Sequence, residues 1–297
     1  MPDVSGNGQP APAPPPGLPP VVAPSGRFIA QLFLVPGLIV AGAVVVLLGF
    51  SWLAGGNRSP QAFLRDLDSS NIDIRKRTAS DLAQVLKRDD GLATNVDFGL
   101  QLVTRLRQAA GELDRADAAS ASESTAGRTE DQNRRWYVQF LIASVGNLMT
   151  PVGGPVLADL ARTGAGRDPK VNATIRRQAV WALAALGEAL QRFDKLPEER
   201  KAAVLEALDR AADGAPGESA AWARKAAAAL RKQAPLGVVA ALAECANADD
   251  PFLRQQVALA LTFWGGTPEE DRLAKATLLK LAHDDGHGTA IQVEKDQ

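Results

Sequence analysis

Residues 168–190 read DPKVNATIRRQAVWALAALGEAL, and this stretch decides the fold class. An aspartate and a proline open it, and apolar residues then recur at three- and four-residue intervals, as in Ile175, Ala179 and Leu183. That period places the three side chains on one face of a helix. The stretch therefore predicts an amphipathic helix that buries one apolar stripe.

The same pattern recurs along the chain: a long side chain, a residue at +3 and a leucine at +7, in most copies after an apolar residue. The copies start at Arg75, Arg134, Arg176, Ala223 and Arg254. A second helical stretch follows each copy, over residues 99–113, 155–162, 197–212, 236–246 and 268–283. A helix pair of this kind cannot bury its stripe alone, so the pattern predicts that successive pairs stack.

Residues 168–190 and 249–265 (DDPFLRQQVALALTFWG) resemble HEAT repeats, particularly the bacterial HEAT-like type. In that type an Asp-rich turn precedes a hydrophobic-Arg pair that opens an Ala/Leu-rich helix. The resemblance covers about residues 60–285 and implies an all-α solenoid of about five helix pairs. It also implies a curved scaffold that presents a concave surface to another protein. The copy at Ala223 departs from the pattern, because it lacks the arginine.

The rest of the chain divides by composition. Within the solenoid, residues 57–285, the stretch 115–133 (RADAASASESTAGRTEDQN) has no apolar stripe and predicts a mobile insert. Residues 286–297 predict a polar tail, and residues 1–26 predict a disordered arm with polyproline II character. Within the arm, residues 10–20 (PAPAPPPGLPP) could dock in an aromatic groove of a proline-binding partner, although a flexible spacer is the plainer interpretation.

Residues 28–53 contain no charged side chain. A helix of this length rises about 39 Å, more than the ~30 Å of a bilayer core, so we expect a transmembrane helix over residues 27–56. A cleaved signal peptide would have a shorter apolar core. Arg27 precedes the run, whereas Arg58 and Arg65 follow it, which predicts a single-pass protein with a cytoplasmic solenoid.

Composition narrows the possible chemistry. The 33 basic and 34 acidic residues nearly cancel, so nothing indicates nucleic-acid binding. Cys245 is the only cysteine, which excludes an internal disulfide. Residues 283–287 (HDDGH) form the only cluster with metal-ligand chemistry, but the spacing matches no established site and a polar tail is the favoured reading. We find no GxSxG, HExxH, CxxC or phosphate-binding loop, and so expect no catalytic residue, metal or cofactor.

Two residue types recur within the copies. The repeated arginines are Arg75, Arg134, Arg176 and Arg254. They would either line a groove for acidic ligands or, as we favour, reach an aspartate such as Asp73 or Asp250, or a helix-end carbonyl, and tie neighbouring copies together. The tryptophans Trp136, Trp181, Trp222 and Trp264 lie at +2, +5, −1 and +10. They share no position, so we expect them to fill the core and not to form an aromatic ladder.

The sequence thus predicts a membrane-anchored HEAT-repeat scaffold that binds a partner protein near the bilayer, without catalysis. It expects no nucleic acid and no small-molecule substrate, and it does not identify the partner-binding residues. One alternative is a HEAT-like lyase or other repeat-fold enzyme, since some HEAT-like proteins attach bilin chromophores. The other is a helix-packing subunit of a membrane complex, in which Gly37, Gly42 and Gly49 allow close approach.

Overall fold

A computed structural model of the chain describes residue 34 and residues 36–47, 59–119 and 125–295. The chain divides into two units, Met1–Asn57 and Arg58–Gln297, and each is described by itself. All regular secondary structure in the described ranges is helical, and no strand occurs there. The all-α part of the prediction is therefore confirmed.

The predicted transmembrane helix over residues 27–56 is wrong. In the smaller unit the structure describes a helix over residues 36–47, and most of the remaining run lies outside the described residues. Among the residues that can be described, no helix combines the length and the apolar character that a membrane crossing needs.

This finding also corrects the interpretations that rested on the span. The single-pass membrane localisation, the cytoplasmic orientation of the solenoid and the membrane-complex subunit were all derived from it. An apolar run shows which residues avoid water, but the length of the helix decides whether the run can cross a bilayer. The predicted disordered arm, residues 1–26, lies outside the described residues.

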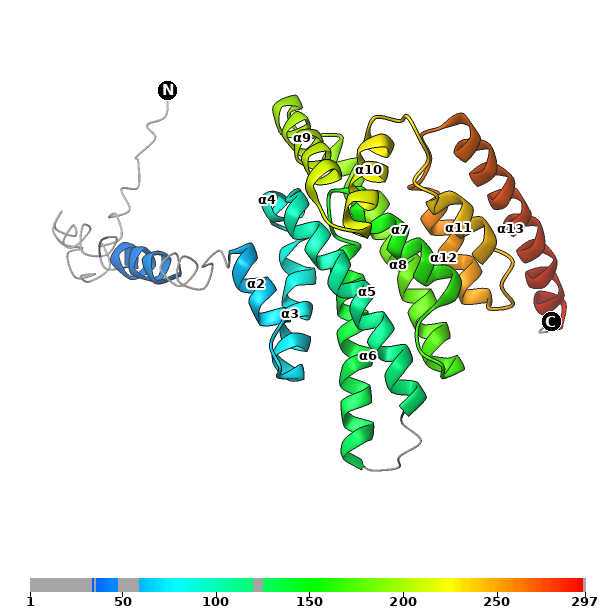
Figure 1. The fold of residues 1–297 in the computed structure, drawn as a ribbon, viewed down its shortest axis with the longest axis horizontal. Coiled ribbons are helices and arrows are strands. Elements are labelled where there is room, and N and C mark those ends of the chain that lie inside the picture. The colour runs from blue at the N-terminus through cyan, green and yellow to red at the C-terminus, as the bar shows by residue number, and fades with distance from the viewer. Residues whose placement is uncertain (1–33, 35, 48–58, 120–124, 296–297) are drawn as a thin grey trace, which may run out of the picture. The chain divides into compact units, whose positions relative to one another are not determined.

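The larger unit consists of helices joined by short loops. In chain order they are α2 (Pro60–Leu67), α3 (Ile72–Val85), α4 (Asp90–Ala93), α5 (Val96–Ala119), α6 (Thr125–Val145), η1 (Pro151–Gly153), α7 (Gly154–Thr163), α8 (Pro169–Phe193), α9 (Glu198–Gly214), α10 (Glu218–Leu230), α11 (Val238–Cys245), α12 (Pro251–Leu261) and α13 (Pro268–Lys295) (Figure 1).

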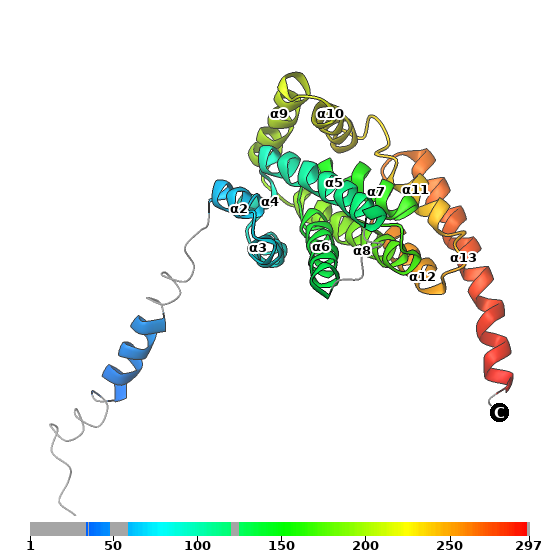
Figure 2. The same cartoon turned by 60° about the horizontal axis from the view of Figure 1, so that its bottom comes forward.

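These helices form two layers (Figure 2). In the first layer α3 packs on α6, α6 on α8, and α8 on α12. The second layer contains α2, α5, α7 and α11, and each packs on the first-layer helix that follows it in the chain. Helix α13 packs on α11 and α12. The first-layer helices are the copies that start at Arg75, Arg134, Arg176 and Arg254, and their +3 and +7 side chains are buried, as predicted.

The fourth predicted copy, which starts at Ala223, does not belong to the first layer. It lies in α10, which packs on α9, α5 and η1, whereas α8 contacts α12 directly. The α9–α10 hairpin, residues 198–230, is therefore an insertion that leaves the layer, and the copy without the arginine is the one displaced (Figure 2). The prediction of five equivalent helix pairs is corrected to four pairs, α13 and this hairpin among the described helices.

Local sequence signals explain where several helices begin. In α8 and α12 an aspartate side chain, Asp168 or Asp250, accepts a hydrogen bond from the backbone N–H two residues on, and a proline occupies the first helical position. Proline fits there because its missing N–H would have no partner in the helix. The Asp-Pro pairs of the sequence are thus helix caps, which fixes the start of two first-layer helices.

Two segments that were predicted as irregular are mostly helical. Of the expected insert 115–133, α5 extends to Ala119 and α6 begins at Thr125. The expected tail 286–297 belongs to α13 as far as Lys295. The prediction of a loop rested on the missing apolar stripe. A helix end that projects beyond its neighbours does not need such a stripe.

First-layer helices approach one another closely at glycines. A Cβ at Gly146, after α6, would lie 2.8 Å from the carbonyl oxygen of Ala182 in α8 and 2.9 Å from its Cα. A Cβ at Gly187 of α8 would lie 2.6 Å from the Cβ of Phe263, after α12. The spacing within the layer therefore requires the absence of a side chain at these two positions.

We expect Gly146→Ala to lower the free energy of unfolding by about 1–3 kcal/mol, because the new methyl group would push against the backbone of α8. Gly111→Ala in α5 is the matched control, since a Cβ there meets nothing within 4 Å. It should raise the free energy of unfolding by about 0.5–1 kcal/mol through helix propensity alone. Urea denaturation followed by circular dichroism measures both, and equal effects of the two changes would contradict the close approach.

Candidate functional site

A groove with an aromatic lining runs over the first layer. Its volume is about 350 Å³, at the lower end of the range for ligand pockets. Helices α6, α8 and α12 supply the lining residues, which are Trp136, Gln139, Phe140, Ile142, Ala143, Arg177, Gln178, Trp181 and Gln256. We call this set the aromatic groove.

Two tryptophans of the aromatic groove are exposed, Trp136 at 45% and Trp181 at 61%. The ring of Trp136 stacks on that of Phe140, with centroids 5.8 Å apart. Core filling is therefore the wrong prediction for these two residues. It is confirmed for Trp222, which is buried, and in part for Trp264, which packs on the core and donates its indole N–H to the carbonyl of Leu183 at 2.8 Å.

The lining of the aromatic groove includes two polar atoms without a partner. The side-chain oxygens of Gln178 and Gln256 are buried, and neither has a hydrogen-bond partner in the described part of the chain. A buried acceptor left without a donor costs about 1–3 kcal/mol. Such groups are uncommon in folded proteins, and two of the several that the described chain contains meet in the aromatic groove, which makes it the candidate site.

Arg177 closes one side of the aromatic groove and joins α8 to α12. Its Nε donates to Asp250 Oδ2 at 2.6 Å, and its guanidinium lies 5.8 Å from the ring centroid of Phe252. Asp250 also caps α12. Burial acts to raise the pKa of Asp250, but hydrogen bonds from Arg177 and from the backbone N–H groups of Leu253 and Phe252 outweigh it and hold that pKa below its usual value. Arg177 is the only charged lining residue, and its charge is paired.

The sequence contained a signal for the aromatic groove. It was missed because the tryptophans were compared only for identical positions within their copies. Trp136 lies at +2 of its copy, and Gln178 and Gln256 occupy the same position of theirs. Trp181 lies at +5, three positions later, and residues three apart face the same side of a helix. Requiring identical positions was too strict, because neighbouring turns of stacked helices contribute to one surface.

The repeated arginines have mainly structural contacts, as we favoured. Arg176 donates to the carbonyl of Ala161 in the last turn of α7, and Arg254 donates to the carbonyl of Ala248, each at 3.0 Å. Arg75 lies over the ring of Tyr137, 4.3 Å from its centroid, which joins α3 to α6. Arg134 differs, because it pairs with Glu130 and Asp131 of its own helix.

The two aspartates expected to receive these arginines behave differently. Asp250 pairs with Arg177 of α8, not with Arg254 of its own copy, so this ion pair does tie neighbouring copies together. Asp73 lies 3.6 Å from Lys76 of its own helix, so that contact is local. The tie between copies is therefore confirmed at Asp250 but not at Asp73.

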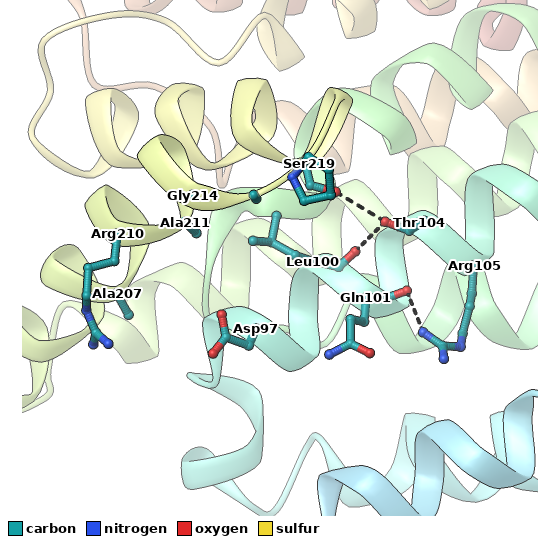
Figure 3. A pocket seen from close by; sticks show the side chains of 12 residues that line it. Asp97, Leu100, Gln101, Thr104, Arg105, Ala207, Arg210, Ala211, Gly214 and Ser219 are labelled. Atoms are coloured by element: carbon teal, nitrogen blue, oxygen red, sulfur yellow. Dashed lines mark hydrogen bonds between the residues drawn. The ribbon is translucent and has the colours of Figure 1, made fainter.

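A second and larger hollow, of about 590 Å³, lies between α5 and the α9–α10 hairpin (Figure 3). Thr104 donates to the carbonyl of Leu100 at 2.9 Å and lies 3.4 Å from the hydroxyl of Ser219. Arg105 pairs with Asp68 outside the hollow. Of the described residues that line it, none holds a buried side-chain polar atom without a partner. Its chemistry therefore points less clearly to a ligand than that of the aromatic groove.

Cys245 and His283, the described residues that the sequence singled out for nucleophilic or metal chemistry, line neither hollow. Cys245 is buried and donates from Sγ to the carbonyl of Ala161 at 3.2 Å. Burial raises the pKa of its thiol, although Arg176 acts in the opposite direction. A protonated buried thiol is a poor nucleophile. Of the cluster 283–287, only the side chain of His283 is described, and it is exposed.

No protein-family model, curated protein or solved structure matches the chain. The aromatic groove therefore has to be interpreted from its own residues.

We expect Gln178→Met to raise the free energy of unfolding by about 1 kcal/mol, because a side chain of similar shape removes a buried acceptor that has no donor. Gln255→Met is the control, since Gln255 is exposed on α12, and it should change stability by less than about 0.5 kcal/mol. Urea denaturation of both variants measures the difference. A loss of stability in Gln178→Met would show that the fold itself supplies a partner to this amide.

We expect Arg177→Ala to be less stable than the unchanged protein at pH 7 by at most about 1 kcal/mol, since the pair with Asp250 is partly exposed. The pKa of Asp250 is lowered in the folded protein. The ion pair therefore stabilises the fold fully above the unfolded-state pKa of Asp250, and this stabilisation disappears as the pH falls through the folded-state pKa. The difference in free energy of unfolding between Arg177→Ala and the unchanged protein should therefore shrink below about pH 4. Denaturation at pH 7, 5 and 3 tests this, with Arg210→Ala, from an exposed pair with Glu206, as the control.

Proposed function

We propose that the larger unit is a HEAT-like scaffold that binds an extended segment of a partner protein in the aromatic groove, without catalysis. The observation that carries this proposal is that two exposed tryptophans and two glutamine oxygens without a donor line one groove of the first layer. The resemblance of residues 168–190 and 249–265 to HEAT repeats supports the scaffold role, and the layered helices agree with it.

The hydrogen-bonding groups favour a polypeptide ligand. A peptide backbone supplies N–H donors at regular intervals along an extended chain. Gln178 and Gln256 lie on neighbouring helices, and a rotation of each amide toward the groove would let one extended segment that crosses both helices donate to both oxygens. Each amide also carries an NH2 group, which can donate to a backbone carbonyl of the same segment.

The aromatic side chains supply most of the binding energy in this proposal. Tryptophan buries a large area and is enriched among the residues that dominate protein interfaces. Trp136 and Trp181 are exposed although they are large apolar side chains, and Phe252, at 65%, is a third exposed aromatic residue of the larger unit. All three belong to the first layer, and Phe252 lies beside the groove residue Arg177. Exposed aromatic side chains that gather on one face mark an interaction surface.

The proposal is tested by selecting peptides from a random twelve-residue library on the full-length chain. We expect selected peptides to bind at least about tenfold more weakly, a loss of about 1.4 kcal/mol, when Trp181 is changed to alanine. Leu279→Ala is the control, because Leu279 is 73% exposed but lies on α13. Fluorescence anisotropy measures the affinities, and circular dichroism checks the fold of each variant.

Two results would contradict the proposal. One is that no peptide is enriched on the full-length chain over the Trp136→Ala/Trp181→Ala double variant. The other is that the enriched peptides bind the Trp181→Ala variant as tightly as the unchanged protein, which would place their site elsewhere.

A further inference from the structure

The chemistry of the aromatic groove also indicates which kind of segment it accepts, an inference that rests on the proposed function. The lining combines aromatic rings with uncharged polar groups. Its one charged residue, Arg177, pairs with Asp250 at 2.6 Å. A strongly acidic or basic segment would gain little there and would lose its own hydration. An uncharged segment is the better match.

The aromatic rings favour proline in that segment. Trp136 and its stacked neighbour Phe140 come from α6, and Trp181 comes from α8, so aromatic faces flank the groove from two helices. Proline-rich segments bind grooves lined with aromatic residues, because their polyproline II conformation exists before binding and little entropy is lost.

The indole N–H groups also favour a proline-rich segment. In the part of the chain that the structure describes, neither Trp136 nor Trp181 donates a hydrogen bond, whereas Trp264 donates to Leu183. A polyproline II segment has no internal hydrogen bonds, so its carbonyls remain free to accept from the indoles. Residues that alternate with proline retain their N–H groups and can donate to Gln178 and Gln256.

We propose that the aromatic groove binds a proline-rich segment of a partner protein, in which proline alternates with small uncharged residues. The prolines stack on Trp136 and Trp181, the indole N–H groups donate to the carbonyls of the segment, and its remaining N–H groups donate to the two glutamine oxygens.

The probe is a synthetic peptide, PAPAPPPGLPP, which has the sequence of residues 10–20 of this chain. The control peptide has serine in place of every proline. Isothermal titration with the full-length chain should show at least tenfold tighter binding of the proline peptide. Trp136→Ala and Trp181→Ala should each weaken it at least tenfold, Trp181→Phe less than Trp181→Ala, and Leu279→Ala not at all.

Three results would overturn the inference. Equal binding of the serine peptide would show that proline is not recognised. No binding of the proline peptide, while library peptides still require Trp181, would leave the proposed function intact and refute this ligand class alone. A dimer in sedimentation experiments that the added peptide dissociates would place residues 10–20 of a second copy in the groove, instead of a segment of another protein.

Discussion

The close approach of α6 and α12 to the two sides of α8 is the constraint on which the other features depend. Gly146 lies against the backbone of α8 at Ala182, and Gly187 of α8 lies against Phe263. These contacts hold three first-layer helices at short distances, so that side chains from all three line one groove. A wider spacing would separate Gln178 from Gln256 and Trp136 from Trp181.

The α9–α10 hairpin shows how an insertion can leave a layered fold intact. It interrupts the chain between α8 and α11, yet α8 packs directly on α12 and α7 on α11. The hairpin packs on α5 and η1, and Arg107 joins it to α5 through Glu218 at 2.8 Å. Its own apolar face is covered there, so α10 needs neither the arginine nor the place of a first-layer helix.

The polar groups of the first layer divide into two kinds. Most are satisfied within the fold: Arg176 and Arg254 reach carbonyls, and Asp250 receives Arg177. Gln178 and Gln256 carry buried oxygens that lack donors, and a few other buried atoms of the described chain, among them Arg75 Nε, also lack a partner. A fold selected for stability alone would replace them with apolar residues. The presence of these two glutamines in one groove with two exposed tryptophans is the physical reason to propose this face, and not the larger hollow beside α9, as the binding surface.

The sequence by itself determined the helical class and the buried stripe at +3 and +7, because these follow from residues a few positions apart. It also predicted a membrane span over the apolar residues 28–53, but no helix in the described part of the chain has the length and apolar character for one. Only the tertiary structure decided that α10 leaves the layer and that Trp136, Gln178, Trp181 and Gln256 share a groove. Those facts depend on contacts between helices 40 and more residues apart, which no local period encodes.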